Sequence, residues 1–313
     1  MVRAGLSMGV MVAWLLAACG SDSAPPADTF EPPPPPPGGM QIVSPEFSIP
    51  PGSEKFICME IPVSLDRDIY VRASRVHQSR GGHHLLAFYT TESEPRIPEP
   101  RDCRGEDMGR GGLRILGVGS SAGSGIALPE GVAFRVPAGV RVIAQSHYIN
   151  AGTQPLVARD AINLELVQRE RVTAFAGAFA QVDLHLELPP RRETTRQMEC
   201  RMPLDGMRVP WLLPHMHEWG VHKRVELRRA SGETLVLWEG EWEAAFRDHF
   251  PIVDLGDMLV GRDDVLRTRC TWHNTLDEPL LFPTEMCATF LVFHPSETGA
   301  LHVCDDTGEE FVL

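Results

Sequence analysis

Two histidines separated by a single residue, His215 and His217, are the side chains whose types and spacing could do chemistry in this sequence. Side chains two residues apart on a β-strand point to the same face, so the two imidazoles would lie side by side. Pro214 directly precedes the pair and disfavours a helix there. Because imidazole is a common metal ligand, the spacing indicates a metal site. A pair of exposed strand histidines fits the same spacing, and the pair alone does not decide between the two.

Three histidines in the first half could also bind a metal. His83 and His84 are consecutive and follow Gly81 and Gly82. Adjacent side chains of a regular strand point to opposite faces, so both can reach one ion only where the backbone is irregular, which the glycines allow. His147 lies in an apolar, strand-like segment and by itself fits a structural histidine better than a ligand.

The N-terminus predicts export and a lipid anchor. Arg3, an apolar run over 8–18 and small residues before Cys19 are typical of a secretory signal, too short to span a membrane. Leu-Ala-Ala-Cys also resembles the lipobox of bacterial lipoproteins, in which the cysteine is acylated; an ordinary signal peptide is the alternative. We therefore expect a signal at 1–19 and a disordered, Pro-rich linker at 20–40. By resemblance, the residues after Cys19 favour attachment to the bacterial outer membrane, on its periplasmic face or at the cell surface, through lipid alone.

Six cysteines remain when Cys19 is set aside. An even number in an exported chain suggests disulfides, and six cysteines allow fifteen pairings among which the sequence does not choose. Their spacing contains no C-x-x-C motif, so thioredoxin-like and zinc-ribbon interpretations have no support. The six are Cys58, Cys103, Cys200, Cys270, Cys287 and Cys304.

Short apolar runs separated by Pro, Gly and Asp predict an all-β protein with two consecutive antiparallel, jelly-roll-like β-sandwich domains. A proline-rich hinge near residue 190 divides the domains into 41–190 and 191–313. A short helix is expected at Glu241–Phe246. The net charge of −13 at pH 7 argues against nucleic acid as a partner, because phosphate binding needs clustered Lys and Arg. The expected strands are Ile42–Ile49, Lys55–Ile61, Ile69–Val76, His84–Tyr89, Gly131–Val136, Arg141–Tyr148, Ile162–Val167, Val172–Ala180, Val221–Arg228, Thr234–Glu239, Val265–Trp272 and Cys287–His294.

Together these features resemble the copper type II, ascorbate-dependent monooxygenases, the family of peptidylglycine α-hydroxylating monooxygenase and dopamine β-monooxygenase. In that family one copper is held by an adjacent His-His pair and a later His in a Gln-x-His-Tyr context, which match His83, His84 and His147. The other is held by the histidines of His-x-His-x-x-Gly and the methionine of Glu-Met-Cys. Those positions are His215, His217, Gly220, Glu285, Met286 and Cys287.

The resemblance covers about 45–305 and implies two β-sandwich domains with one copper each. It implies that the three-histidine copper stores and delivers electrons from ascorbate or a similar donor. The copper of His215, His217 and Met286 would react with O₂ and hydroxylate a substrate C–H bond. The resemblance also implies the disulfides Cys58–Cys103, Cys200–Cys304 and Cys270–Cys287.

The donor atoms favour the same metal. Imidazole suits copper, zinc, iron and nickel, whereas a thioether selects for Cu(I). A lone methionine is ordinarily core filler, but a disulfide at Cys287 would fix the backbone of Met286. We therefore interpret the chain as a copper-dependent monooxygenase. The alternative is a non-catalytic copper-binding or structural, adhesion lipoprotein that keeps the fold; a zinc-binding or metal-free protein would leave Met286 without a role.

Three positions depart from the peptide-amidating members, where polar residues hold the substrate carboxylate. Leu213 replaces their Arg before the first histidine, and Ala288 and Phe290 replace their Asn and Tyr after the methionine. A carboxylate placed there would lose its charge-assisted partners. These three residues are the substrate-pocket candidates, and they predict an apolar or non-carboxylate substrate.

A peptide with a C-terminal glycine is therefore expected not to be a substrate. The measurement is hydroxylation of a glycine-extended peptide by copper-loaded protein supplied with ascorbate and O₂. Robust turnover of that peptide would show that the carboxylate is held by other residues and would refute the prediction.

Overall fold

The computed structural model describes residues 30–93, 96–103, 112–120, 123–243, 245–248 and 251–312. The predicted signal segment with Cys19, and residues 20–29 of the predicted linker, lie outside this part. Within it the protein is all-β, as predicted, with one 3₁₀ turn, Arg169–Arg171, and one four-residue helix, α2, Ala245–Asp248. None of the described helices is long and apolar enough to cross a membrane.

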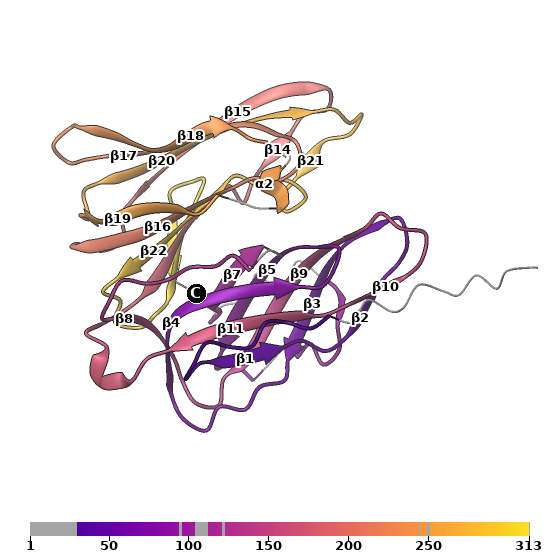
Figure 1. Ribbon diagram of the computed structural model, residues 1–313. Helices are drawn as coiled ribbons and strands as arrows, with labels where there is room; N and C mark the ends of the chain where they lie inside the picture. The colour runs from indigo at the N-terminus through magenta and orange to yellow at the C-terminus, as the bar shows by residue number, and fades with distance from the viewer. Residues whose placement is uncertain are drawn as a thin grey trace, which may run out of the picture.

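The first half of the chain forms two five-stranded sheets, drawn in indigo to magenta in Figure 1. One has the order β1-β11-β4-β8-β12, with strands Met40–Val43, Asp160–Leu166, Ile69–Gln78, Val132–Val136 and Ala174–Phe175. The other has the order β6-β3-β9-β5-β7, with strands Arg101–Asp102, Ser53–Ile61, Arg141–Asn150, Gly82–Thr90 and Arg114–Ser120. A small ribbon pairs β10, Leu156–Ala158, with β2, Phe47–Ile49.

A hydrophobic cluster draws on both of these sheets. Val76 and Ile162 come from the first, and Met59, Leu85 and Val142 from the second, and all five side chains are fully buried. Alternation of buried and exposed residues along β4 directs one face of that strand inward. Full burial of each such side chain contributes about 1.5–3 kcal/mol, which makes this cluster the main stabilising element of the first half.

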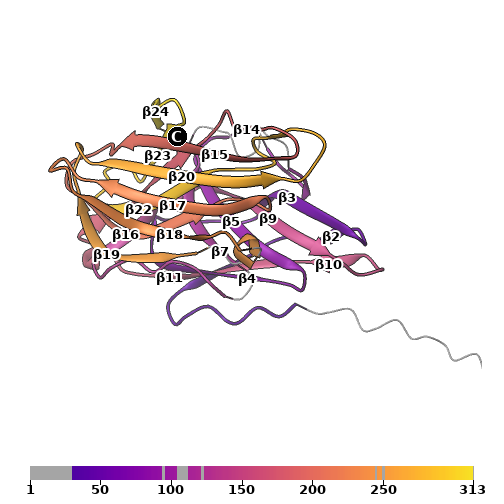
Figure 2. The same cartoon turned by 90° about the horizontal axis from the view of Figure 1, so that it is seen from above.

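The second half forms a six-stranded and a four-stranded sheet. The six-stranded sheet has the order β19-β16-β22-β13-β23-β24, with strands Val253–Val260, Met207–His215, Ala288–His294, Gly177–Val182, Leu301–Asp305 and Glu310–Val312. The four-stranded sheet, seen from above in Figure 2, has the order β15-β20-β17-β18, with strands Arg192–Arg201, Val265–Asn274, Gly220–Arg228 and Thr234–Glu241. A second cluster, with Phe179, Leu212, Leu227, Leu266 and Phe293, lies between these sheets. The pair β14, Glu187–Leu188, and β21, Leu280–Leu281, stands beside them.

Sheet membership changes near residue 176. Strand β13 precedes the expected division at 190, yet it pairs with β22 and β23 of the second half. The run expected as one strand at Val172–Ala180 is therefore two strands, because the chain passes from one sheet to another between β12 and β13. The β12–β8 and β13–β23 pairs are parallel, and the other described pairs are antiparallel. The expected helix begins later, because β18 extends to Glu241 and α2 starts at Ala245.

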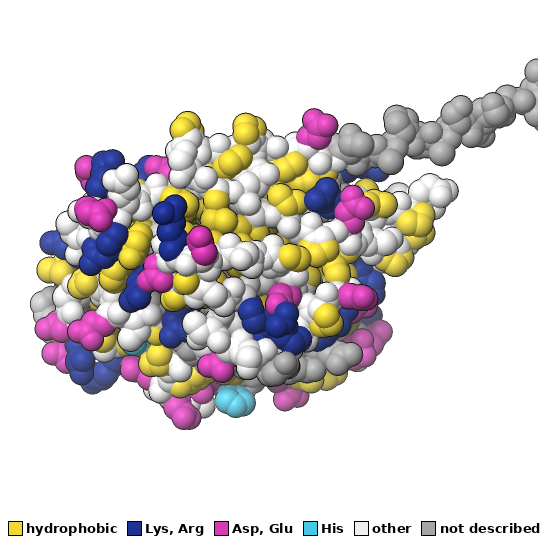
Figure 3. Space-filling model, turned by 90° about the horizontal axis from the view of Figure 1, so that it is seen from below, with side chains coloured by type: hydrophobic (Ala, Val, Ile, Leu, Met, Phe, Trp, Pro, Cys, Tyr) yellow, Lys and Arg dark blue, Asp and Glu magenta, His cyan; other side chains and the backbone are white. Residues whose placement is uncertain are grey.

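The two halves are in direct contact. Leu213 and Val292, from β16 and β22, belong to the buried cluster of the first half. The indole N–H of Trp211 donates to the carbonyl of Ala127 at 2.7 Å. On the face seen from below in Figure 3, the Lys and Arg side chains of the described residues are interspersed with Asp and Glu side chains.

Three disulfides join Cys58 to Cys103, Cys200 to Cys304, and Cys270 to Cys287. These are the pairings implied by the family resemblance. The first lies in the first half, and the other two link the two sheets of the second half, so each half carries its own covalent constraint.

The proline segment is held against the first sheet from residue 33 onward. The carbonyl of Pro33 accepts hydrogen bonds from the side-chain amides of Gln41, at 2.7 Å, and Asn163, at 3.0 Å. A Cβ at Gly39 would lie 2.3 Å from the Leu164 carbonyl oxygen, so only glycine fits this close approach. This part of the expected linker is therefore fastened to the folded protein.

A buried carboxyl lies under the strand that carries His147. Asp160 is fully buried and accepts hydrogen bonds from the side chains of Ser146, Tyr148 and Gln78. Burial raises the pKa of Asp160 from 3.8 to about 6, although these hydrogen bonds oppose the shift. Between about pH 4 and about pH 6 the folded state therefore binds more protons than the unfolded state, and the free energy of unfolding falls as pH rises.

An Asp160→Asn variant is expected to lose this pH dependence, because the amide mimics the neutral carboxyl. Two pKa units correspond to about 3 kcal/mol, so wild type should lose up to about 3 kcal/mol relative to the variant between pH 4 and pH 7. Urea unfolding of both proteins across this range is the measurement. Parallel pH profiles for the two proteins would contradict the assignment.

Candidate metal centre

A β-bulge brings His83 and His84 to the same side of the first half. The register between β5 and β9 pairs Gly82 with Tyr148 but His84 with His147, so His83 is the extra residue. Gly81, just before the bulge, has φ +85°, a conformation that favours glycine. The ring of His147 lies 5.0 Å from that of His83 and 4.8 Å from that of His84, centre to centre. The irregular backbone predicted for this histidine pair is confirmed.

Phe56, His147 and His84 lie side by side on three neighbouring strands and form a row across the sheet. In the register of β3, β9 and β5, Phe56 is opposite His147, which is opposite His84. The rings of Phe56 and His147 stack with centres 4.1 Å apart and an interplanar angle of 5°. Ser146 and Tyr148, the neighbours of His147, contact the buried Asp160, so the row occupies the other face of the sheet.

Glu54 determines which nitrogen of His147 carries the proton. Its carboxylate oxygen Oε1 lies 2.7 Å from Nε2 of His147. Because a carboxylate only accepts hydrogen bonds, Nε2 must donate, and in the neutral imidazole the lone pair is then on Nδ1. A carboxylate behind a histidine is the usual way in which proteins orient a metal ligand.

The second histidine pair is placed differently from the expectation. Strand β16 ends at His215, and His217 lies beyond it in the turn that leads to β17, so the prediction of two strand residues is wrong for His217. The rings of His215 and His217 are nevertheless 4.9 Å apart, at 87°. Desolvation lowers the pKa of His215 well below its usual value, and the nearby rings of His217 and His84 add to this, so His215 is held in its neutral form.

A buried carboxylate joins the segment of His217 to the segment of Met286. Oε1 of the fully buried Glu285 accepts the backbone N–H groups of His217, at 2.7 Å, and Met286, at 2.8 Å. Its Oε2 accepts the N–H of Trp219 at 3.0 Å. Burial raises the pKa of Glu285, while His217 and these amides oppose the shift. Segments 68 residues apart in sequence are thereby fixed to each other.

Met286 and His217 have further restraints. Nδ1 of His217 donates to the carbonyl of Thr284 at 3.0 Å, which leaves the lone pair of the neutral ring on Nε2. Cys287, the neighbour of Met286, forms a disulfide with Cys270 on β20. This bond restrains the backbone of Met286, as expected from the sequence. The Met286 side chain is half-buried and packs near Phe282 and Phe290.

The separations of the ring centres can be compared with the value expected for two imidazoles on one ion. Two imidazoles that bind one ion at about 2.0 Å in a tetrahedral arrangement have ring centres about 5 Å apart. The distances of 5.0, 4.8 and 4.9 Å agree with this value. The ring nitrogens of His83, His84 and His147 do not all lie within 4.8 Å of one another, so binding of one ion by all three would require the rings to turn about their side-chain torsions.

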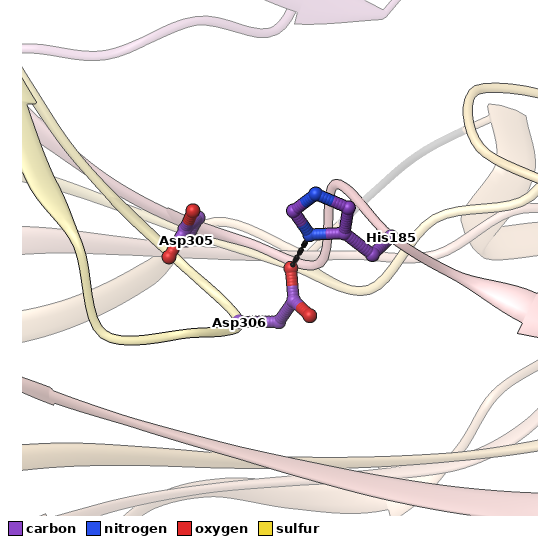
Figure 4. Close-up of side chains that lie close together, drawn as sticks. All are labelled: His185, Asp305 and Asp306. Atoms are coloured by element: carbon purple, nitrogen blue, oxygen red, sulfur yellow. Dashed lines mark hydrogen bonds and ion pairs between the residues drawn. The ribbon is translucent and has the colours of Figure 1, made fainter.

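Among the described residues, His185, Asp305 and Asp306 are the group whose ligand atoms all lie within 4.8 Å of one another. In Figure 4, His185 Nδ1 donates to Asp306 at 2.9 Å, while Asp305 lies to one side. Arg196 faces Asp306 at 3.4 Å, and Asp305 Oδ1 accepts three hydrogen bonds from its own turn. Both carboxylates thus accept hydrogen bonds or an ion pair from protein groups, and the bonds to Asp305 stabilise the turn that follows it.

The two candidate sites lie close together. The ring centre of Phe56 is 4.1 Å from that of His147, 6.2 Å from that of His84 and 6.4 Å from that of His217. Phe56 therefore contacts the row of the first half and reaches the turn of the second. Neither Glu54 nor Phe56 was anticipated from the sequence. Phe56 lies on the expected strand Lys55–Ile61, whereas Glu54 precedes that range and lies on the observed, longer strand β3.

The three substrate-pocket candidates share the neighbourhood of His215. Leu213 pairs with Phe290, and His215 with Ala288, in the register of β16 and β22. Leu213 and Ala288 are buried, whereas Phe290 is half-buried with its ring 6.3 Å from that of His215. Phe290 is therefore the most accessible of the three apolar replacements.

Comparison with known proteins leaves the family open. No family model and no curated protein matches the sequence. Solved structures with some likeness include the major capsid protein P2 of bacteriophage PM2, at 10% identity and a TM-score of 0.32, covering 83% of this chain and 99% of that one. The Gx strain of infectious bursal disease virus gives 8% identity and a TM-score of 0.22, covering 83% of this chain and 73% of that one. Likenesses at this level carry no conclusion about this chain.

The hydrogen bonds predict opposite tautomers for two histidines. Neutral His147 should carry its proton on Nε2, because of Glu54, and neutral His217 on Nδ1, because of the Thr284 carbonyl. Long-range ¹H–¹⁵N correlation NMR of metal-free protein distinguishes the tautomers. A Glu54→Ala variant should abolish the preference at His147 and leave His217 unchanged. The same tautomer at both positions would contradict the geometry.

Proposed function

We propose that the protein is a copper-dependent monooxygenase that hydroxylates a C–H bond of an apolar or non-carboxylate substrate, using O₂ and an ascorbate-like donor. We further propose that each pair of sheets is a jelly-roll-like β-sandwich domain with one copper. The proposal rests on two observations. The rings of His84, His147 and His217, from three distant segments, lie close to the ring of Phe56, and the buried carboxylate of Glu285 accepts the backbone N–H groups of both His217 and Met286.

The donor sets suit two different tasks. His83, His84 and His147 would hold one copper, and His215, His217 and Met286 the other. Copper bound at these sites would supply electron transfer and O₂ reduction, so that substrate C–H, O₂, two electrons and two protons would yield an alcohol and water. The thioether favours the reduced ion in the second set, whereas the three imidazoles suit an ion that passes electrons on.

The residues of the chain prepare these donors. Glu54 presents Nδ1 of His147, and the Thr284 carbonyl presents Nε2 of His217. The lowered pKa of His215 keeps its lone pair available. The apolar residues beside it, Leu213 and Phe290, limit water near His215 and would favour an apolar substrate. The proposed location is the bacterial outer membrane, with Cys19 lipidated.

Purified protein is expected to bind two coppers per chain. A His215→Ala variant should bind one, because the three-histidine set remains, whereas His222→Ala should still bind two. His222 is a fitting control because it lies on β17 and faces Glu239 at 3.7 Å. Metal content of the purified variants is the measurement. A wild-type chain that binds fewer than two coppers would end the proposal.

Catalysis is a separate outcome from binding. Copper-loaded protein with ascorbate should consume O₂ in proportion to product when supplied with a substrate, and Met286→His should retain copper but lose turnover. Copper binding without coupled O₂ uptake across a broad panel of apolar compounds would support the non-catalytic alternative.

A further inference from the structure

We propose that Lys223 and Glu285 are positioning residues that hold His215, His217 and Met286 in one arrangement. This inference rests on the proposed function, because it assigns the two residues to the second copper site. Lys223 lies on β17, and both side chains are fully buried.

Lys223 joins the ends of two strands that belong to the opposite sheet. Its Nζ donates to the carbonyl of His215 at 3.2 Å and to the carbonyl of Ala288 at 2.5 Å. These residues face each other in the register of β16 and β22. The lysine therefore fixes the end of the strand that carries His215 beside the start of the strand that follows Met286. An amine donates two hydrogen bonds in either protonation state, so this role does not depend on charge.

Glu285 fixes the other side of the candidate site, because its carboxylate accepts backbone hydrogen bonds. It takes the backbone N–H groups of His217, Met286 and Trp219. Together the two side chains contact the backbone of each of the three ligand residues: the carbonyl of His215 and the amides of His217 and Met286.

Burying the amine of Lys223 costs desolvation free energy that an apolar side chain would avoid. Lys is almost never fully buried unless paired, and apolar residues of similar size often replace buried charges without loss of stability. Both hydrogen bonds of Lys223 go to backbone at the candidate site. Such outer contacts are the means by which proteins orient metal ligands, and their loss typically lowers metal affinity by about 10- to 100-fold.

The test compares Lys223→Met with Thr268→Val. Thr268 bonds Thr289 at 2.9 Å across the same two sheets and is equally buried, but its hydroxyl bonds that threonine and not one of the three ligand residues. Cu(I) affinity is measured by competition with a chromophoric chelator, sulfur coordination by X-ray absorption, and stability by urea unfolding of metal-free protein. Lys223→Met should keep the first copper and weaken the second by about 10- to 100-fold, with a reduced sulfur signal. Thr268→Val should keep both coppers and the sulfur signal.

The outcomes separate this inference from the proposed function. A wild-type chain that binds fewer than two coppers defeats the proposed function. Two coppers in wild type and an unchanged second affinity in folded Lys223→Met defeat only the positioning role, even if stability falls. Should Lys223→Met not fold, Glu285→Gln decides: its amide cannot accept the Trp219 N–H, so the second affinity should fall, and an unchanged affinity overturns the inference.

Discussion

The packing of Phe56 against His147 and beside His217 is the contact on which the candidate site depends. The two histidine sets belong to different halves of the chain, and no covalent bond among the described disulfides joins those halves. Their proximity therefore relies on side-chain packing, to which Leu213 and Val292 contribute from the second half. Burial of such apolar surfaces is non-directional, whereas the Trp211 hydrogen bond to Ala127 and the hydrogen bond from the Ser296 N–H to the Phe175 carbonyl add directional contacts between the halves.

Each half supports its histidines with a buried polar network of its own. Behind His147 lies Asp160, bonded through the two neighbours of that histidine, Ser146 and Tyr148. Behind His215 and His217 lie Lys223 and Glu285. Buried polar groups cost free energy unless their hydrogen bonds are made, but when satisfied they define one geometry better than an apolar core does. The candidate ligands in each half thus lie beside buried hydrogen bonds that fix the neighbouring backbone.

The sequence predicted the class of fold and the local irregularity at His83, because strand periodicity and glycine flexibility act over a few residues. It also indicated which histidines meet, through the family resemblance. It did not predict the end of β16 at His215, since the turn is imposed by Glu285, a residue 68 positions away from His217. The division near residue 190 was placed on prolines, whereas β13 joins the second half by pairing with strands beyond residue 287. Long-range pairing of this kind leaves no local signal.

Position 213 has a structural explanation that is independent of substrate. Leu213 is 5% exposed and belongs to the cluster through which the halves contact each other. An arginine there would bury a guanidinium among apolar side chains, which costs several kcal/mol unless a partner is supplied. The leucine at position 213 is therefore explained by the packing of the two halves. Phe290 is different, because it remains half-buried with its ring 6.3 Å from that of His215, so it offers more accessible apolar surface near that histidine than Leu213 does.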